Sequence, residues 1–250
     1  MELNLKNKKV LITGSTRGIG KAIAEEFSYY GSKVVLNSRD EVGLIETSKS
    51  IPYSSWVQAD VTKALEAKYL VKKTIELMNN IDILICNVGS GNSAKPGEEE
   101  IRDWEEMFSV NFYSAVNVIE AAREFLIKSK GVIICISSIC GSNYVKGAPI
   151  TYSTSKAALN SYIKLSAKLF GKFGVRINGI APGNIIFEGS VWDKKINENS
   201  SKVKNFLNED VPLNRLGEPI EIAKLACFLA SEVSSFATGD IWRIDGGQSF

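Results

Sequence analysis

Short apolar runs alternate with longer amphipathic stretches along most of this 250-residue chain. The apolar runs predict strands at residues 10–12, 33–37, 55–59, 81–86, 132–137, 175–181 and 240–244. Apolar residues at helical spacing predict helices at residues 19–30, 40–50, 62–78, 101–128, 151–173 and 219–231. Gly31 follows the first of these helices, and glycine tolerates the positive φ with which many helices end.

This alternation of strand and helix predicts the fold class. A strand followed by a crossover helix returns parallel to its neighbour, so the pattern favours an α/β fold with one doubly wound parallel sheet of about seven strands and helices on both faces. The strands are continuously apolar, as is typical of strands covered on both faces. The sequence shows no Pro/Gly-rich linker and no internal repeat, and we therefore expect a single domain over residues 1–250.

One polar segment breaks the rhythm of strands and helices. Residues 188–210 are rich in Lys, Asn, Glu and Ser, with apolar residues spaced through them. An insertion near the carboxyl ends of the strands is typical of a mobile substrate lid. A solvated pair of surface helices is the alternative, and the sequence leaves both interpretations open.

Composition and charge narrow the classes of function. The net charge is +2 and the basic residues are spread along the chain, which argues against a nucleic-acid partner. The first residues are polar, and no stretch approaches the roughly 18 consecutive apolar residues of a membrane span. We expect a cytoplasmic protein with no membrane partner and with reduced cysteines.

The chain contains no histidine, which removes the commonest general base and the commonest metal ligand. Its four cysteines form no C-x-x-C pair, so we expect no metal site. Buried reduced thiols are the simplest interpretation of these cysteines. Cys140 lies two residues after Ser138 and is the cysteine to test for thiol reactivity.

A glycine-rich turn, Thr-Gly-Ser-Thr-Arg-Gly-Ile-Gly at residues 13–20, follows the first predicted strand and leads into a helix. Glycines let the backbone approach a pyrophosphate closely, and the helix amino end offers free N–H groups. The spacing differs from the G-x-G-x-x-G fingerprint, and such a turn alone is as often only structural. Its position between strand and helix favours a dinucleotide site that includes Gly14, Ser15, Arg17, Gly18, Ile19 and Gly20.

The end of the second predicted strand indicates which dinucleotide binds. NAD-binding sheets usually place an acid here to bond the ribose 2′-hydroxyl, but this chain has Asn37 and Ser38. Arg39 and Arg17 can pair with a 2′-phosphate through forked hydrogen bonds. We therefore predict NADP, with NAD less favoured. Asp40 beside Arg39 counts against this choice, and a solvated surface role for Arg39 is the alternative.

Polar residues after the next strands lie at the same predicted edge of the sheet. Asp60 can accept a hydrogen bond from an adenine amino group, or it can cap the helix that follows. Val61, Asn87 and Gly89 accompany it at this edge.

Tyr152 and Lys156 are four residues apart on a predicted helix, so their side chains emerge from one face. Hydride transfer to a carbonyl requires a proton for the developing alkoxide. A tyrosine can supply it if a nearby cation lowers its pKa from near 10. Ser138 can donate a hydrogen bond to the carbonyl, and Asn111 can bind a water that replenishes the proton. Tyr-x-x-x-Lys alone occurs on many helices, but its combination with Ser138 and the glycine turn predicts catalysis.

These motifs resemble the standard short-chain dehydrogenase/reductase family over essentially the whole chain. The matching residues are Thr13-Gly14-x-x-x-Gly18-x-Gly20, Asn87-x-Gly89, Asn111, Ser138, Tyr152-x-x-x-Lys156, Pro182-Gly183, Thr238-Gly239 and Asp245-Gly246-Gly247. The resemblance implies a Rossmann-type fold, nicotinamide-dependent oxidoreduction of a carbonyl or alcohol, and often a homotetramer. The long helices at 101–128 and 151–173 could pair across subunits of such a homo-oligomer.

The resemblance also implies a role for each catalytic residue. Tyr152 is the acid/base, and Lys156 lowers its pKa and holds the nicotinamide ribose. Ser138 orients the substrate oxygen, and Asn111 supports a proton relay. The cofactor-binding residues that we expect are Gly14, Ser15, Arg17, Gly18, Ile19, Gly20, Ser38, Arg39, Asp60, Val61, Asn87, Gly89, Tyr152, Lys156, Pro182, Gly183 and Ile185.

Several positions depart from the family pattern. Cys86 and Val88 replace the first Asn and the Ala of the usual Asn-Asn-Ala-Gly, which alters the packing expected around the adenosine. Phe187 stands where the family often has a threonine that contacts the nicotinamide amide. Ser138 and Tyr152 are one residue farther apart than in many relatives, which alters the loop at 141–149.

The expected activity is NADP-dependent reduction of a small carbonyl compound, or oxidation of the corresponding alcohol. The chain is similar to oxoacyl-carrier-protein reductases and to sugar or polyol dehydrogenases, and residues 184–195 depart from the acyl reductase pattern. This favours a sugar or other polar carbonyl, with 3-oxoacyl-carrier-protein reductase as the alternative activity. A non-catalytic redox sensor is disfavoured by the intact catalytic residues. A nucleotide-sugar epimerase or dehydratase is disfavoured by chain length and glycine spacing.

Overall fold

A computed structural model describes residues 2–249 of the chain. Its strands form one parallel sheet with the order β3-β2-β1-β4-β5-β6-β7. The strands are β1 (Lys9–Thr13), β2 (Lys33–Ser38), β3 (Ser54–Gln58), β4 (Ile83–Cys86), β5 (Val132–Ile136), β6 (Arg176–Pro182) and β7 (Ile241–Ile244). The predicted doubly wound α/β fold is confirmed.

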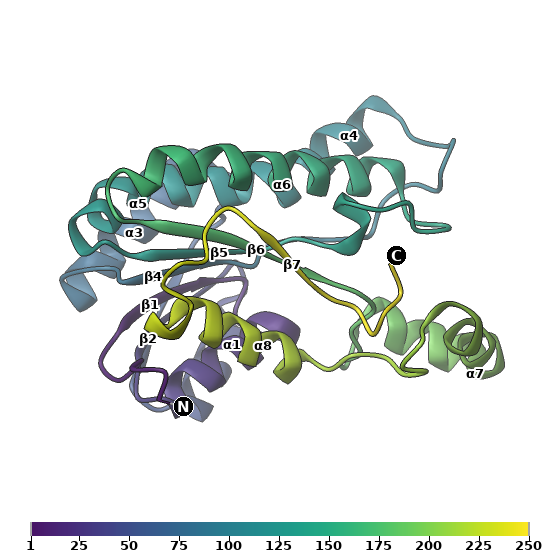
Figure 1. The fold of residues 1–250 in the computed structure, drawn as a ribbon, viewed down its shortest axis with the longest axis horizontal. Helices are drawn as coiled ribbons and strands as arrows, with labels where there is room; N and C mark the ends of the chain where they lie inside the picture. Colours follow the sequence, from purple (N-terminus) through teal and green to yellow (C-terminus); the bar gives the residue numbers. More distant parts are fainter. Residues whose placement is uncertain (1, 250) are drawn as a thin grey trace.

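Helices cover both faces of this sheet (Figure 1). They are α1 (Gly18–Tyr29), α2 (Glu41–Ser50), α3 (Ala64–Met78), α4 (Ile101–Phe108), α5 (Ser114–Ser129), α6 (Ile150–Gly171), α7 (Val191–Asp210) and α8 (Pro219–Ala230). In Figure 1, α3, α5 and α6 lie above the sheet and α1 and α8 lie below it. The two faces therefore bury two separate layers of apolar side chains.

The alternation of side chains along each strand explains why the strands are continuously apolar. Leu11 of β1 packs into the layer under α3, α5 and α6, whereas its neighbours Val10 and Ile12 pack into the layer of α1 and α8. Phe170 of α6 and Phe27 of α1 are almost completely buried, one in each layer. Burial of each such side chain stabilises the fold by ~1.5–3 kcal/mol.

The order of the strands determines where a ligand can bind. The chain runs outward from β1 to β2 and β3, then crosses back to β4 on the other side of β1. Loops that leave β1 and β4 therefore diverge, and a crevice opens between them at the carboxyl ends of the strands. The glycine-rich turn after β1 and the residues that follow β4 and β5 all lie at this edge.

The predicted helix at 101–128 is interrupted. A π-helical turn, Ser109–Tyr113, separates α4 from α5, and Asn111 lies within it. The Asn111 Nδ2 donates to the carbonyl oxygen of Met107 at 3.1 Å. A π turn adds one residue to a helical turn and is common at functional sites. The apolar spacing continues through the turn and therefore predicts one uninterrupted helix.

The segment at 188–210 forms α7, which is folded back on itself (Figure 1). Asn199 inside α7 has non-helical dihedral angles, φ −160° and ψ 88°. The rings of Trp192 and Phe206 stack at a centroid distance of 5.0 Å. Fourteen residues of continuous helix would separate the two residues by ~21 Å, so the kink brings the two arms together. The predicted helix pair is therefore the observed form, and its role as a lid stays a prediction.

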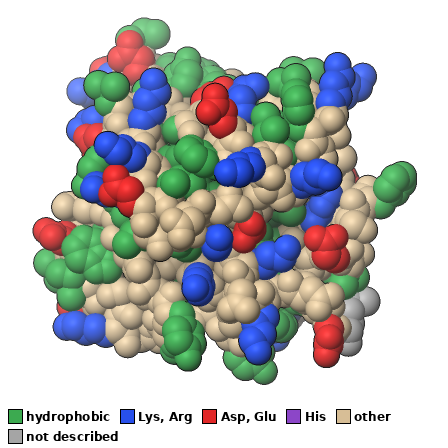
Figure 2. Space-filling view, turned by 90° about the vertical axis from the view of Figure 1, so that its left-hand side faces the viewer, with side chains coloured by type: hydrophobic (Ala, Val, Ile, Leu, Met, Phe, Trp, Pro, Cys, Tyr) green, Lys and Arg blue, Asp and Glu red, His purple; other side chains and the backbone are tan. Residues whose placement is uncertain are grey.

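The end of the molecule away from α7 has a mixed surface. Figure 2 shows basic, acidic and apolar side chains interspersed on this face. Within residues 2–249, no helix combines the length and the apolar character needed to cross a membrane.

Candidate active site

A cleft of about 1190 Å³ lies at the carboxyl ends of the central strands. Its walls come from the turn after β1, the ends of β2 and β3, the loops after β4, β5 and β6, and α7. The predicted site residues on these walls are Gly14, Arg17, Ile19, Ser38, Arg39, Asp60, Val61, Asn87, Gly89, Ser138, Tyr152, Lys156, Pro182, Gly183 and Ile185. The predicted residues outside the lining are Ser15, Gly18, Gly20 and Asn111. The fold thus brings together residues from distant parts of the chain.

The glycine-rich turn depends on close backbone packing. A Cβ at Gly20 would lie 2.2 Å from the carbonyl oxygen of Gly14 and 2.4 Å from Nδ2 of Asn87. That amide nitrogen donates to the carbonyl oxygens of Gly14 at 2.8 Å and Thr13 at 3.2 Å. Asn87, from the loop after β4, therefore holds the turn after β1 in place. Its amide hydrogens are engaged by the protein backbone, so its side chain positions the site.

Ser15 ties the same turn to β2. Its backbone N–H donates to the carbonyl oxygen of Asn37 at 3.0 Å, and its hydroxyl accepts from the N–H of Asn37 at 2.9 Å. The side chain is completely buried. We expect from the sequence that Ser15 contacts the cofactor, but its hydrogen bonds to Asn37 direct the hydroxyl into the fold.

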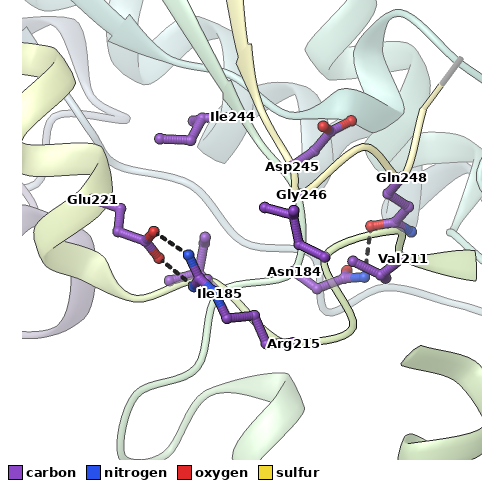
Figure 3. Close-up of a pocket in the computed structure, with 11 residues that line it drawn as sticks. Asn184, Ile185, Val211, Arg215, Glu221, Ile244, Asp245, Gly246 and Gln248 are labelled. Atoms are coloured by element: carbon purple, nitrogen blue, oxygen red, sulfur yellow. Dashed lines mark hydrogen bonds and ion pairs between the residues drawn. The ribbon is translucent and has the colours of Figure 1, made fainter. Parts of the chain in front are cut away.

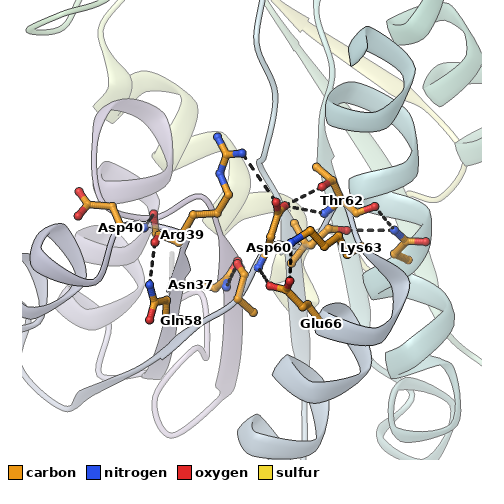
Figure 4. A network of polar contacts seen from close by, with 12 residues as sticks. Asn37, Arg39, Asp40, Gln58, Asp60, Thr62, Lys63 and Glu66 are labelled. Carbon is orange, nitrogen blue, oxygen red and sulfur yellow. Dashed lines mark hydrogen bonds and ion pairs between the residues drawn. The ribbon is translucent and has the colours of Figure 1, made fainter. Parts of the chain in front are cut away.

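Asn37 presents an unpaired acceptor beside the cleft, and the sequence analysis missed this. Its Nδ2 donates to the carbonyl oxygens of Val57 and Ala59, each at 3.1 Å, which fixes the orientation of the amide (Figure 4). Its buried Oδ1 accepts no hydrogen bond within residues 2–249. A buried acceptor without a partner is costly. Because Asn37 lines the cleft, a ligand donor is the partner that this oxygen fits.

Arg39 and Asp60 form an ion pair across the nucleotide end of the cleft (Figure 4), with Nη1 3.8 Å from Oδ2. Thr62 donates from its N–H and its hydroxyl to the other Asp60 oxygen, at 3.1 and 2.7 Å. Burial acts to raise the pKa of Asp60, but the bonds from Thr62 and the charge of Arg39 outweigh it, so the pKa is lowered. Asp60 is thus an anion in the fold. It is not the N-cap of α3, a position that Lys63 occupies.

Asp40 is directed away from the nucleotide end of the cleft. It is the N-cap residue of α2, and its Oδ1 accepts from the N–H of Gly43 at 3.1 Å. The helix amino end stabilises this charge. Asp40, the acid that disfavoured NADP in the sequence, is therefore used to cap α2.

Tyr152 and Lys156 lie on one face of α6, as predicted. The Nζ of Lys156 donates to the carbonyl oxygen of Ile136 at the end of β5, at 2.8 Å. Burial lowers the pKa of Lys156 to about 8. Burial also raises the pKa of Tyr152 to about 12, against the opposing effect of a hydrogen bond with Ser138. In the protein alone the pKa of Tyr152 is therefore raised, because burial dominates, and the expected effect of Lys156 on this pKa stays a prediction.

Asn160 is a supporting residue that sequence reasoning missed. Its Oδ1 accepts from the hydroxyl of Ser137 at 2.5 Å, and its Nδ2 donates to the hydroxyl of Ser142 at 3.0 Å. It thereby holds the segment after β5 that contains Ser138. The available signal was its spacing, because Asn160 follows Lys156 by four residues on the same helix face.

Cys140 lies on the cleft wall beside Ser138. Burial raises the pKa of its thiol, although Ser138, its own backbone N–H and Lys156 act in the opposite direction. The thiolate is the reactive form of cysteine. The geometry therefore does not favour the thiol reactivity that the sequence raised for this residue.

Asn111 clamps the loop after β4. Its Nδ2 donates to the carbonyl oxygens of Ser90 and Met107, and its Oδ1 accepts from the N–H of Ser90 at 2.9 Å. Both amide hydrogens are therefore engaged. A Cβ at Gly89 would lie 3.0 Å from both Asn111 Oδ1 and Lys156 Nζ, so this glycine lets the two side chains approach. The amide hydrogens of Asn111 are therefore not available to bind the predicted water.

Phe187 covers part of the glycine-rich turn. Its ring lies against Gly18, where a Cβ would be 2.6 Å from the Cζ of Phe187. Gly18 also has a positive φ of +52°. An apolar ring from the loop after β6 thus stands on the cleft wall where the family often has a threonine.

Hydrogen bonds to the carboxyl-terminal part of the chain hold the loop between β6 and α7 in place. A cavity of about 80 Å³ lies between this loop and the carboxyl-terminal segment (Figure 3). Asn184 donates from Nδ2 to Gln248 at 2.7 Å, and its carbonyl oxygen accepts from the N–H of Gly217 at 2.9 Å. Beside them, a forked hydrogen bond from Arg215 lowers the pKa of Glu221 to about 2. α7 therefore extends from a fixed base.

Comparison with known proteins places this chain among oxidoreductases. A family model described as enoyl-(acyl carrier protein) reductase matches residues 14–249. Glucose 1-dehydrogenase 2 of Bacillus subtilis is 32% identical over 257 residues, which cover 100% of this chain and 97% of that protein. The 3-oxoacyl-[acyl-carrier-protein] reductase FabG of Aquifex aeolicus is 33% identical over 253 residues, which cover 99% of both proteins.

Solved structures agree with this placement. A 7α-hydroxysteroid dehydrogenase in complex with NADH and 7-oxo glycochenodeoxycholic acid matches with a TM-score of 0.91 and 28% identity, covering 99% of this chain and 96% of the other. An RhlG/NADP active-site complex from Pseudomonas aeruginosa matches with a TM-score of 0.90 and 27% identity, covering 98% of both chains.

The packing of the turn generates a first prediction. We expect Gly20→Ala to lower the free energy of unfolding by ~1–3 kcal/mol and to weaken NADPH binding, because the new Cβ meets the backbone oxygen of Gly14. Urea denaturation and NADPH fluorescence titration measure the two effects. Gly171→Ala is the matched control: it has open space around it at the end of α6, and we expect unchanged or slightly higher stability. Wild-type stability and affinity in Gly20→Ala would contradict the packing argument.

Proposed function

Because this chain belongs to the short-chain dehydrogenase/reductase family of oxidoreductases, we propose that it transfers a hydride between NADP and a carbonyl or secondary alcohol substrate. Tyr152 is the acid/base of the proposed reaction. The observation that supports this most directly is the meeting of Tyr152, Lys156 and Ser138 in the cleft beside the glycine-rich turn. These residues supply a proton donor and a carbonyl ligand at one place.

The residues of the cleft fit a dinucleotide. The glycine-rich turn has the close backbone approach that a pyrophosphate needs, and Asn37 offers a buried oxygen without a partner. Structural neighbours were solved with NADH or with NADP. Tyr152, Lys156, Pro182, Gly183 and Ile185 border the part of the cleft proposed for the nicotinamide. A bound nicotinamide supplies the hydride donor or acceptor.

The pKa values of the catalytic pair suit reduction. At neutral pH Tyr152 keeps its proton, because its pKa is raised to about 12, so it can donate to an alkoxide. Ser138 donates to the same substrate oxygen in our proposal and orients it. Lys156, whose pKa is lowered to about 8, remains largely an ammonium at neutral pH. It stabilises the phenolate that Tyr152 becomes after the proton leaves.

Two arguments support NADP over NAD. No carboxylate stands at the end of β2, and Arg39 reaches across this end of the cleft with a side chain that is 75% exposed. An exposed guanidinium can exchange its long contact with Asp60 for a bidentate bond to a 2′-phosphate. Arg17, also exposed on the cleft wall, is a second phosphate ligand in this proposal.

The substrate side of the cleft is formed by α7. Trp192, Val203 and Phe206 line it together with the loops after β4 and β5. We propose that residues 188–210 act as a substrate lid and that the substrate is a polar carbonyl compound. The likeness to glucose 1-dehydrogenase 2 supports this choice. The likeness to FabG and the description of the family model keep 3-oxoacyl-carrier-protein reduction as the second candidate.

We propose a single domain that works in the cytoplasm as a homo-oligomer. Leu165 and Leu169 of α6 and Tyr113 before α5 are exposed apolar side chains on the long helices, with exposed fractions of 71%, 43% and 51%. Exposed apolar side chains on adjacent helices support association of copies of the chain.

The acid/base role has a direct test. We expect Tyr152→Phe to lower kcat for carbonyl reduction by ~10²–10⁴-fold, because the ring remains but the proton is lost. NADPH binding should stay close to that of the wild-type protein, and fluorescence titration measures it. Tyr144→Phe serves as control, since Tyr144 is 91% exposed and lies outside the cleft lining. Unchanged turnover by Tyr152→Phe would refute the mechanism.

The lowered pKa of Lys156 predicts a pH dependence. We expect kcat/KM for reduction to be level below about pH 8 and to fall above it, because the ammonium loses its proton there. Tyr152 stays protonated over this range, since its pKa is about 12. Initial rates at saturating NADPH and low substrate give the profile. A profile that stays level to pH 10 would contradict the assignment.

Cofactor choice has its own test. We expect wild-type protein to have a higher kcat/KM with NADPH than with NADH, and Arg39→Ala to reduce that preference by ~10-fold through loss of a charged hydrogen bond. Arg102→Ala is the matched control, because this exposed arginine lies on α4 outside the cleft lining. A wild-type preference for NADH would overturn the choice of NADP.

A further inference from the structure

The substrate side of the cleft has an excess of positive charge. Its charged residues come from the loops after β4 and β5, from α4 and from both arms of α7: Lys95, Lys146, Lys195, Lys202, Glu106 and Glu198. Four ammonium groups thus face two carboxylates. An excess of positive charge on the walls of a cleft attracts a ligand of negative charge.

These lysines are not neutralised by the protein. Within residues 2–249, none of the four has a carboxylate oxygen within 4.0 Å. Three lysines elsewhere do have a carboxylate partner: Lys21 with Glu25 at 3.9 Å, Lys63 with Glu66 at 2.8 Å and Lys73 with Glu76 at 2.6 Å. The positive charge in the cleft therefore remains available to a ligand.

Lys195 is the best placed of the four. Its Nζ lies 4.4 Å from the centroid of the Trp192 ring, and that ring stacks on Phe206 at 5.0 Å with an interplanar angle of 26°. Trp192 and Phe206 line the cleft themselves. The stack is thus a firm apolar platform that holds an ammonium through a cation–π contact. A lysine side chain that is already held in one position loses less conformational entropy on binding a ligand than a freely rotating one.

Lys202 supplies a second ammonium from the other arm of α7. Its backbone N–H donates to Oδ1 of Asn199 at 2.8 Å, which starts the second arm directly after the kink. Lys195 and Lys202 therefore reach the same cleft from opposite sides of the kink.

We propose that the substrate carbonyl compound carries an anionic group, a carboxylate or a phosphate, that pairs with Lys195 and, from the second arm, with Lys202. The inference rests on the proposed function and names the substrate class of the same site. The Trp192–Phe206 stack contacts the carbon skeleton, while Tyr152 and Ser138 receive the carbonyl. The proposed substrate therefore differs from a neutral sugar or polyol in carrying a negative charge.

Matched pairs of compounds test the proposal and distinguish the two anions. The carboxylate arm compares 4-oxopentanoate with its methyl ester, and the phosphate arm compares dihydroxyacetone phosphate with dihydroxyacetone. We expect kcat/KM with NADPH to favour the anion in at least one arm by ~10-fold or more, mainly through KM, as for a charged hydrogen bond. Lys195→Ala should remove most of this ratio, and Lys195→Glu should reverse it.

Lys204→Ala is the matched control, because Lys204 lies on the same arm as Lys202 but outside the cleft lining. We expect it to keep the wild-type ratio. A binding measurement independent of turnover accompanies the kinetics: calorimetric titration of the four compounds into the NADP-loaded protein, wild type and Lys195→Ala.

The outcomes separate the inference from the function on which it rests. Equal or weaker binding of both anions relative to their neutral partners overturns the inference, even if the ketones are reduced. Tighter binding of an anion that Lys195→Ala abolishes supports it. Failure to reduce any ketone with NADPH or NADH, in protein that binds the dinucleotide, overturns the proposed function instead.

Discussion

The site depends on one bridge between two strands. The amide of Asn87, which follows β4, donates to the carbonyl oxygens of Thr13, the last residue of β1, and of Gly14 after it. β1 and β4 are the neighbours between which the strand order reverses, so their loops would otherwise diverge. The bridge fixes the glycine-rich turn at that point, and Gly20 leaves room for it. The glycine-rich turn therefore forms a fixed wall of the open cleft.

Burial sets the pKa values of Tyr152 and Lys156 in the cleft. Tyr152 is half-buried and Lys156 is buried, and this burial raises the pKa of the tyrosine and lowers that of the lysine. The first effect keeps the proton on the donor, and the second makes the ammonium sensitive to mildly alkaline pH. Asn160 and Asn111 hold the neighbouring loops through hydrogen bonds of their side-chain amides, so Tyr152 and Lys156 sit in a preorganised frame.

The two ends of the cleft are built differently. The nucleotide end is formed by strand ends and is held by backbone bonds, as at Ser15 and Asn37. The substrate end is formed by α7, whose two arms are held together by the Trp192–Phe206 stack and separated by the kink at Asn199. The anchored loop at Asn184 sets where α7 begins.

The amino-acid sequence alone is enough to predict the parallel sheet, because continuous apolar strands alternating with amphipathic helices have few other solutions. It also places Tyr152 and Lys156 on one helix face and locates the glycine-rich turn, since these are features of local spacing. Four features became apparent only in the folded chain: the π turn at Asn111, the inward bonds of Ser15, the kink of α7 and the raised pKa of Tyr152. Each of these arises from contacts between residues distant in sequence or from removal of water, and periodicity along the chain contains neither.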